Sequence, residues 1–373
     1  MDFLRLHADL DLIPAKESLS GKVVIEFKIL KNIDVVFLDA KNMQASLAPD
    51  SKVEATLSMD ADKLWIKHNF VAGRTYEISF LYTAEPKQTL YFTGWNDAGS
   101  NQVFTQGQGK ETSHWLPSID DLNEKIEFDL SITAPKNYRV IANGKLVDST
   151  SLTGKTRWEF DMEKPMSSYL VALAIGDFQY KTIYSQSDIP IKLFYEAKDS
   201  LKVETTYLHS GEIFDFLEKE IGVDFPWKIY KQVPVRDFLY AGMENTTLTI
   251  FSEAFVIDSV AFIDRNYVNV NAHELAHQWF GNLVTEKSST HHWLQEGFAT
   301  YYALLAEKEI FGDDYFYFKL YQSAESLKAR SDKGEGEAVL NPKAGSLTFY
   351  QKGAWALHIL REKIGAEAFR EAV

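Results

Sequence analysis

Apolar and polar positions alternate with a period of two through the first half of the chain. The segments in which nearly every second residue is apolar are 4–12, 23–29, 76–80 and 126–132. Successive side chains of a β-strand point to opposite faces, so this pattern predicts strands with one buried and one wet face. The helical period of 3.6 is missing from residues 1 to about 180. We therefore predict an N-terminal antiparallel β saddle or sandwich domain over residues 1–183.

Two loops of this region carry a further signal. Asn143-Gly144 lies between two β-like runs and predicts a tight hairpin turn, because both residues adopt positive φ readily. The segment 106–109, Gln-Gly-Gln-Gly, is typical of a turn. Glycine also lets the backbone approach a ligand closely, so the amides of Gln106 and Gln108 are candidates to orient a polar group. The pattern of this loop leaves both interpretations open.

The pattern changes near residue 184, where the polar segment 185–188 predicts a linker. Apolar residues then recur with the helical period, after a predicted strand at 191–195. Caps and glycines at their ends predict helices at about 200–221, 264–281, 290–311, 313–330 and 347–364. These helices form a second, mainly helical domain over residues 184–373, so the fold class is α+β with more than one domain. The chain stops at Val373 inside another helical pattern, and we expect it to be part of a longer protein.

The composition narrows the classes of partner. The formal net charge is −14 and the pI about 5.2, which argues against nucleic acid and anionic membranes. The chain has no cysteine, so a disulfide framework and a thiol nucleophile are excluded, and a zinc site must use histidine and carboxylate. No apolar run approaches the length of a membrane span. The first residues lack the pattern of a signal peptide, so we expect a cytoplasmic location and leave secretion of a processed form open.

The strongest chemical signal is His-Glu-Leu-Ala-His at 273–277. Positions four apart lie on the same face of an α-helix, so His273 and His277 can bind one ion with their ring nitrogens. Imidazole suits a borderline-soft metal such as zinc. The surrounding sequence predicts a helix that is capped by Asp264 and ends at Gly281.

Two histidines leave a zinc site incomplete, because catalytic zinc usually has three protein ligands and one open position. Glu296 follows His277 on the next predicted helix and is the candidate third ligand. Glu274 stands between the histidines, near the ion without binding it, where a general base for a zinc-bound water belongs. The alternative is that all of these are ordinary polar side chains on helix surfaces.

Several motifs taken together resemble one known family. They are Tyr-Ala-Gly-Met-Glu-Asn at 240–245, His-Glu-Leu-Ala-His at 273–277, Glu296, Tyr-Gln-Lys-Gly at 350–353 and Gln-x-Gln at 106–108. In order and spacing they resemble the zinc aminopeptidases related to aminopeptidase N and leukotriene hydrolase, over nearly the whole chain. The resemblance implies an N-terminal β saddle, a thermolysin-like catalytic domain and a C-terminal helical domain. The third domain would begin where this chain stops.

The resemblance also implies roles for single residues. Glu244 would hold the ammonium of a peptide's free N-terminus, and Gln108 would accept a second N–H. Tyr350 would donate a hydrogen bond to the developing oxyanion. The backbone of Gly242 and Met243 would align the substrate strand. We therefore expect an aminopeptidase that uses one zinc ion and acts on peptides with a free N-terminus.

The sequence departs from the family pattern in places, and other readings stay open. Gln295 replaces the asparagine before the third ligand, and Thr-His-His at 290–292 replaces the residues ahead of it. The segment 340–343 lacks the aspartate of the epoxide-hydrolysing branch, so epoxide hydrolysis is not expected. The alternatives are a thermolysin-like zinc endopeptidase and a metal-binding module that has lost catalysis. The presence of both Glu274 and Tyr350 counts against the second.

Overall fold

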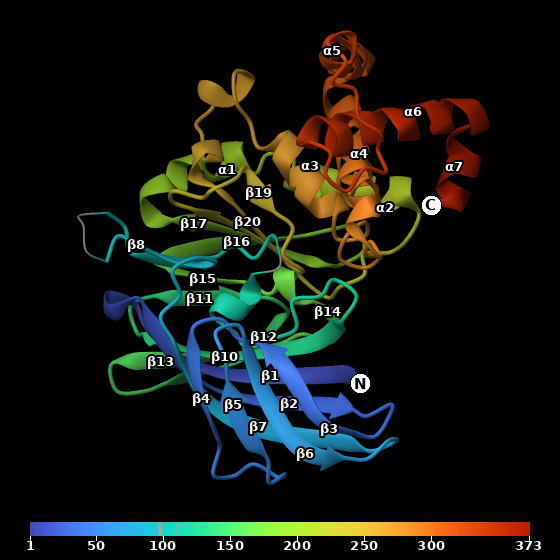
Figure 1. The fold of residues 1–373 in the computed structure, drawn as a ribbon. Coiled ribbons are helices and arrows are strands. Elements are labelled where there is room, and N and C mark those ends of the chain that lie inside the picture. The colour runs from blue at the N-terminus through green and yellow to red at the C-terminus, as the bar shows by residue number, and fades with distance from the viewer. Residues whose placement is uncertain (96–98, 110) are drawn as a thin grey trace.

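The computed structural model of the protein describes residues 1–95, 99–109 and 111–373 (Figure 1). β-sheets make up the N-terminal half, at the bottom of Figure 1, and helices gather in the C-terminal half, at the top. This arrangement confirms the predicted α+β class, with an all-β region followed by a mainly helical one. Within the described residues, no helix combines the length and the apolarity needed to cross a bilayer.

The largest sheet of the β region has eight strands. Its order is β12-β13-β10-β1-β2-β7-β4, and β14 also pairs with β10. The strands are β1 (Asp2–Ile13), β2 (Ser18–Lys28), β4 (Met43–Leu47), β7 (Thr75–Ala84), β10 (Lys125–Pro135), β12 (Lys145–Ser151), β13 (Lys155–Asp161) and β14 (Met166–Ser167). The four predicted strands fall in β1, β2, β7 and β10, and their apolar residues other than the exposed Leu4 belong to one core or pack against it. β1 and β10 are parallel, unlike the antiparallel prediction. No short turn connects these strands, so nothing local sets their direction.

Two smaller sheets complete the β region. A three-stranded sheet contains β3 (Ile33–Asp39), β6 (Lys63–Phe70) and β5 (Thr56–Met59). A four-stranded sheet contains β11 (Arg139–Ala142), β15 (Leu173–Gly176), β9 (Gln102–Thr105) and β8 (Leu90–Thr93). The second of these lies next to the helical region in Figure 1, and the 106–109 loop leaves it directly after β9.

Asn143-Gly144 forms a turn, but the predicted hairpin is wrong. The strand before the turn, β11, pairs with β15, and the strand after it, β12, pairs with β13. The two strands therefore diverge into different sheets. The Asn143 amide donates to the backbone oxygens of Leu170 at 3.0 Å and Thr246 at 2.6 Å. These distant contacts hold the turn at the junction of the two regions, and a local turn signal cannot reveal them.

The second region begins with a five-stranded sheet of order β16-β17-β18-β20-β19. Its strands are β16 (Phe178–Tyr184), β17 (Pro190–Glu196), β18 (Tyr230–Val235), β19 (Gly242–Met243) and β20 (Leu248–Ser252). The segment 185–188, predicted as a linker, is the turn between β16 and β17, which pair with each other. The division of the chain at 183/184 stays a prediction, and this pairing places the first strand of the second sheet at Phe178.

The helices follow and interleave with this sheet. They are α1 (Val203–Thr206), α2 (Ser210–Ile221), α3 (Val268–Ala276), α4 (His292–Phe311), α5 (Asp313–Asp332), the π-helical turn η8 (Thr348–Lys352), α6 (Gly353–Ile364) and α7 (Ala366–Ala372). Short 3-10 turns are Pro14–Lys16, Thr112–His114, Ser168–Leu170, Ala197–Lys202, Glu253–Phe255, Ala261–Ile263 and Ser289–His291. The predicted helix at 200–221 is broken, because only its second half continues as the regular helix α2.

The boundaries of α3 differ from those predicted. The helix begins at Val268, whose backbone N–H is capped by the Asn266 side chain at 3.2 Å, and not after Asp264. It ends at Ala276, before Gly281. His277 keeps helical backbone angles and its N–H still bonds to the His273 oxygen at 3.2 Å. The two histidines therefore retain the spacing of one helical turn.

A buried lysine joins the two regions. Lys231 on β18 is 3% exposed, and its Nζ donates to the backbone oxygens of Ala142 and Gly144, at the turn of the β region. Burial lowers the pKa of Lys231 well below its ordinary value. A buried carbonyl without a donor costs free energy, so this ammonium satisfies two groups that would otherwise be unpaired at the junction.

We predict that Lys231→Met lowers the free energy of unfolding by about 1–3 kcal/mol, because the buried carbonyls of Ala142 and Gly144 lose their donor. Chemical denaturation of the two proteins measures the difference. The control is Lys192→Met, at the position paired with Lys231 on the neighbouring strand but only partly buried. Its effect is expected to stay within about 0.5 kcal/mol. Equal stability of the two variants would contradict the role of Lys231.

Candidate metal centre

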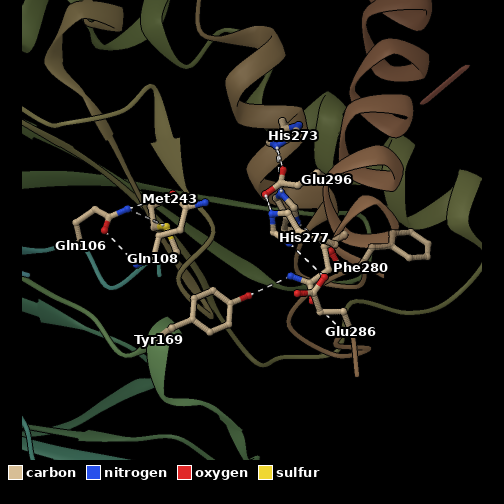
Figure 2. Close-up of polar contacts among 11 residues, drawn as sticks. Gln106, Gln108, Tyr169, Met243, His273, His277, Phe280, Glu286 and Glu296 are labelled. Atoms are coloured by element: carbon tan, nitrogen blue, oxygen red, sulfur yellow. Dashed lines mark hydrogen bonds and ion pairs between the residues drawn. The ribbon is translucent and has the colours of Figure 1, made fainter. Parts of the chain in front are cut away.

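Two histidines of α3 and one glutamate of α4 converge on one point. The Nε2 atoms of His273 and His277 lie 3.1 Å apart. Glu296 Oε2 lies 3.3 Å from each of them. Figure 2 shows the carboxylate between the two imidazole rings. The helices that carry these residues pack side by side, as the sequence predicts. This packing brings Glu296 next to His277, although the two residues are 19 positions apart in the chain.

The geometry of these three atoms fits a divalent ion. Ligands about 2.0–2.1 Å from a tetrahedral ion lie roughly 3.3 Å from one another, close to the three distances observed. Glu296 Oε2 is buried and no donor hydrogen-bonds to it. The His277 Nδ1 lies 2.9 Å from the Phe280 oxygen and donates to it, so Nε2 is the ring nitrogen that faces Glu296 and can bind a metal ion. Two imidazole nitrogens and one carboxylate oxygen are a donor set that suits zinc.

The charges at this point favour a cation. Burial alone would lower the pKa of His277, but the negative charge of Glu296, together with those of Glu244 and Glu274, raises it to about 10. Burial alone would raise the pKa of Glu296, and the two imidazoles instead hold it well below its usual range. The carboxylate is therefore ionised and attracts a positive charge. A bound metal ion would take the place of the proton on His277.

Glu274 lies beside this point and is nearly enclosed. Its side chain belongs to α3, it is 6% exposed, and the backbone of Gly242 covers it. A Cβ added at Gly242 would come 2.5 Å from Glu274 Oε1, so only glycine lets β19 pass this close. Burial, reinforced by Glu244 and Glu296 against the opposing charge of His277, raises the pKa of Glu274 well above its usual value. A carboxyl group in this state can both accept and return a proton.

These residues share one cavity of about 290 Å³. The predicted site residues that line it are Gln108, Gly242, Glu244, His273, Glu274, His277, Glu296 and Tyr350. Glu244 is 5% exposed and follows β19 directly. One ligand-type atom from each of Glu244, Glu274 and His277 lies within 4.8 Å of the others. The carboxylate of Glu244 is therefore an immediate neighbour of the metal-ligating group.

Gln106 and Met243 lie behind the cavity wall. Gln106 is buried, and its Oε1 accepts the backbone N–H of Gln108 at 3.0 Å. Its Nε2 lies 3.6 Å from the Met243 sulfur (Figure 2). Neither residue is among the described residues that line the cavity. Their side chains hold the loop that presents Gln108, while Gln108 itself faces the cavity.

Tyr350 enters the cavity from the π-helical turn η8. Its ring stacks on that of His273, with centroids 5.6 Å apart and an interplanar angle of 5°. Burial, followed by the charges of nearby glutamates, raises the pKa of Tyr350, so the hydroxyl stays protonated and able to donate. Next to it α4 and α6 touch backbone to backbone, because a Cβ added at Gly353 would lie 3.0 Å from the Gly297 Cα. π-Helical turns often occur at functional positions.

Two further residues touch the site without having been predicted to do so. His292 Nε2 lies 3.6 Å from Glu296 Oε1, and its Nδ1 lies 3.2 Å from Glu286 Oε2. The spacing of His292 and Glu296 by four positions was a usable signal. Tyr169 is buried beside the cavity, with its hydroxyl 3.5 Å from Gln295 Nε2. Nothing local distinguishes Tyr169 from an ordinary core tyrosine.

Comparisons with known proteins agree with this fold and site. The family model described as the peptidase family M1 domain matches residues 206–373, and that of the peptidase M1 N-terminal domain matches residues 4–170. The fold, the candidate metal-ligating triad and both matches agree on one class of protein, the M1 peptidases. The chain belongs to peptidase family M1.

Two relatives are aminopeptidases that are longer than this chain. The leucyl aminopeptidase of Saccharolobus solfataricus is 28% identical, with 91% of this chain and 45% of the relative covered. Human endoplasmic reticulum aminopeptidase 1 is 30% identical, with 81% of this chain and 34% of the relative covered. A mutant M1 zinc metallopeptidase from Deinococcus radiodurans, bound to a Tyr-Ser-Ala substrate, has the same fold, with a TM-score of 0.80, 21% identity, and 99% of this chain and 85% of that chain covered. The chain thus spans less than half the length of the first two relatives.

We predict that Glu296→Ala lowers the affinity for zinc by more than about 100-fold, since losing even the hydrogen-bond partner of a ligand costs about 10–100-fold. Zinc content after dialysis against a weak chelator measures the loss. The matched control is Glu307→Gln, a buried glutamate on the same helix that binds Asn269 Nδ2 at 2.9 Å. This control is expected to retain its zinc. Full zinc content in Glu296→Ala would remove that residue from the ligand set.

Proposed function

We propose that this protein is a zinc-dependent aminopeptidase that removes the first residue from peptides. The observation that carries the proposal is the position of Glu244, a buried carboxylate within the cavity of the three ligands. His273, His277 and Glu296 would hold the zinc ion. The aminopeptidase names of the relatives support the same activity, although the chain covers only part of their length.

Glu244 explains why the reaction would be limited to the peptide's end. A free α-amino group has a pKa of about 7.7–8.0, so it is largely an ammonium ion at neutral pH. Glu244 would bind that ammonium by charge-assisted hydrogen bonds, with the Gln108 side chain accepting another N–H. A chain fixed at its amino end beside the metal ligands places only its first peptide bond over them.

The remaining residues divide the chemistry of hydrolysis. His273, His277 and Glu296 would hold a zinc ion, which would supply Lewis acidity to polarise a scissile carbonyl and to lower the pKa of a water molecule. Glu274 would accept the proton of the attacking water and return it to the leaving amine. Tyr350 donates a hydrogen bond to the oxyanion. Gly242, which lies against Glu274, lets the substrate backbone approach this base.

A second cavity supports a preference for the first side chain. It has a volume of about 250 Å³ and shares Gln108 and Glu244 with the first cavity. Leu122, Tyr169, Pro342 and Phe349 give it apolar walls. A substrate whose ammonium binds Glu244 would direct its first side chain into this space. We therefore propose a preference for a large, uncharged first residue, and rejection of an acidic one by Glu244 and Glu286.

The first test of the mechanism is Glu274→Gln. Removing the base is expected to lower kcat by about 10²–10⁴, because general acid–base catalysis contributes about that factor. Zinc content should stay at one ion per chain. The activity control is Glu196→Gln, a buried glutamate of β17 that pairs with Lys198 outside the cavity. Full activity in Glu274→Gln would refute the assignment of the base.

A panel of aminoacyl fluorogenic substrates tests the proposed specificity. Substrates that begin with Leu, Phe or Tyr are expected to exceed those with Glu or Asp by at least tenfold in kcat/KM. N-acetylation should slow each of them about 100-fold, because it leaves the buried Glu244 without its cationic partner.

The same panel separates the alternatives. Acetylated and free peptides cut at equal rates would favour the thermolysin-like endopeptidase. A zinc-loaded protein that cuts neither would favour a metal-binding module without catalysis. The position of Glu274 and Tyr350 in the cavity argues against that module.

A further inference from the structure

The segment 244–247, here called the anchor loop, contains Glu244 and is held in a strained conformation. Thr247 has a φ of 64°, in the left-handed region that β-branched residues rarely adopt. Such a residue costs about 1–3 kcal/mol and persists only where its surroundings impose it. All four residues of the anchor loop are buried. The contacts that impose this shape therefore also fix the backbone from which the Glu244 side chain projects.

The side-chain amides of two residues in the helical region form hydrogen bonds with the anchor loop. The Gln278 Oε1 accepts the backbone N–H of Thr247 at 2.9 Å, and its Nε2 donates to the backbone oxygen of Glu244 at 3.2 Å. The Nε2 also lies 3.4 Å from the Asn245 oxygen. Asn282 Nδ2 donates to the same backbone oxygen of Glu244 at 2.7 Å. Both amide residues are fully buried, so these hydrogen bonds do not compete with water.

These amides belong to the same turn as a metal ligand. Gln278 follows His277 directly, and the Asn282 N–H donates to the His277 oxygen at 3.0 Å. A shift of this turn would therefore move the ligand and both amides together. The turn thus connects His277 to the backbone of Glu244, through the peptide bond to Gln278 and through the hydrogen bonds of Gln278 and Asn282.

The β region braces the anchor loop from the opposite side. Asn143 Nδ2 donates to the Thr246 oxygen at 2.6 Å, and the Gly144 N–H donates to Thr247 Oγ1 at 2.8 Å. These contacts fix the loop against the rest of the molecule. They do not join it to the turn of His277, which is the part played by Gln278 and Asn282.

From this arrangement we propose that Gln278 and Asn282 are positioning residues that set the distance between Glu244 and the metal ligands. That distance decides which peptide bond of a substrate anchored at Glu244 reaches the metal. The inference rests on the proposed function, because it takes Glu244 as the group that binds the amino terminus. Neither amide needs to touch the substrate for this role.

Binding of leucinamide to the zinc-loaded protein tests the proposal by calorimetry. In Gln278→Leu the anchor loop loses its tie to the His277 turn, and the affinity for leucinamide is expected to fall by tenfold or more. The affinity for N-acetyl-leucinamide should stay unchanged, because that compound has no ammonium to place at Glu244. Zinc content should remain one ion per chain. Asn282→Ala, which removes a single hydrogen bond, should show the same selective loss to a smaller degree.

Peptide digestion gives a second readout. With a hexapeptide, the unmodified protein should release single residues, whereas Gln278→Leu should release a measurable share of dipeptide because the carboxylate is no longer fixed. The matched control is Gln232→Leu. Gln232 is a buried amide that contacts α3 through Asn271 but does not touch the anchor loop. It reports the effect of disturbing α3 alone, and its ligand affinity and cleavage position should match those of the unmodified protein.

The outcomes separate the two levels of the argument. If the unmodified protein binds leucinamide and N-acetyl-leucinamide equally, Glu244 does not bind the amino terminus. The proposed function and this inference then fail together. If the unmodified protein prefers leucinamide but Gln278→Leu and Asn282→Ala behave like Gln232→Leu, only the positioning role is overturned. If one of the two variants fails to fold, the other still tests the positioning role, because Gln278 and Asn282 donate to the same backbone carbonyl of Glu244.

Discussion

The structure depends on holding one buried carboxylate against two imidazoles. Glu296 Oε2 lies 3.3 Å from the Nε2 of both histidines, with no hydrogen-bond donor to satisfy it. This contact requires α3 and α4 to lie side by side, and it requires α6 to approach α4 closely enough to bring Tyr350 over His273. The facing glycines 297 and 353 permit that approach, because a side chain on either would meet backbone at 3.0 Å.

The cavity concentrates negative charge, and this charge favours the binding of cations. Glu244, Glu274 and Glu296 line a space of about 290 Å³. Like charges in a poorly hydrated site oppose ionisation, which is one reason why the pKa of Glu274 is raised. A metal ion and an ammonium group are the two cations that such a site can place at different carboxylates. The same electrostatic constraint thus favours the metal, the substrate's amino end and a protonatable base.

The site is completed by both regions of the chain. The helical region contributes the ligands and the base, and the β region contributes Gln108 and the turn at Asn143-Gly144. That turn does not close a hairpin. It reaches across the junction, where Lys231 satisfies its carbonyls and Asn143 holds the loop that bears Glu244. The β region therefore lines part of the cavity and holds the loop of Glu244, in addition to supporting the helical region.

The sequence by itself determined the features that depend on local geometry. The alternation of β1 and β10, the end of α4 at Gly312 and the pairing of His273 with His277 all follow from the period of a strand or a helix, which neighbouring residues set. Motif spacing added Glu296, Glu244 and Tyr350. Tertiary structure alone decided that β1 and β10 are parallel, that the strands on either side of Asn143-Gly144 join different sheets, and that Gln278 and Asn282 contact the loop of Glu244. Those contacts join segments far apart in the chain, so their partners are chosen by packing and by the need to pair buried polar groups, which no local pattern encodes.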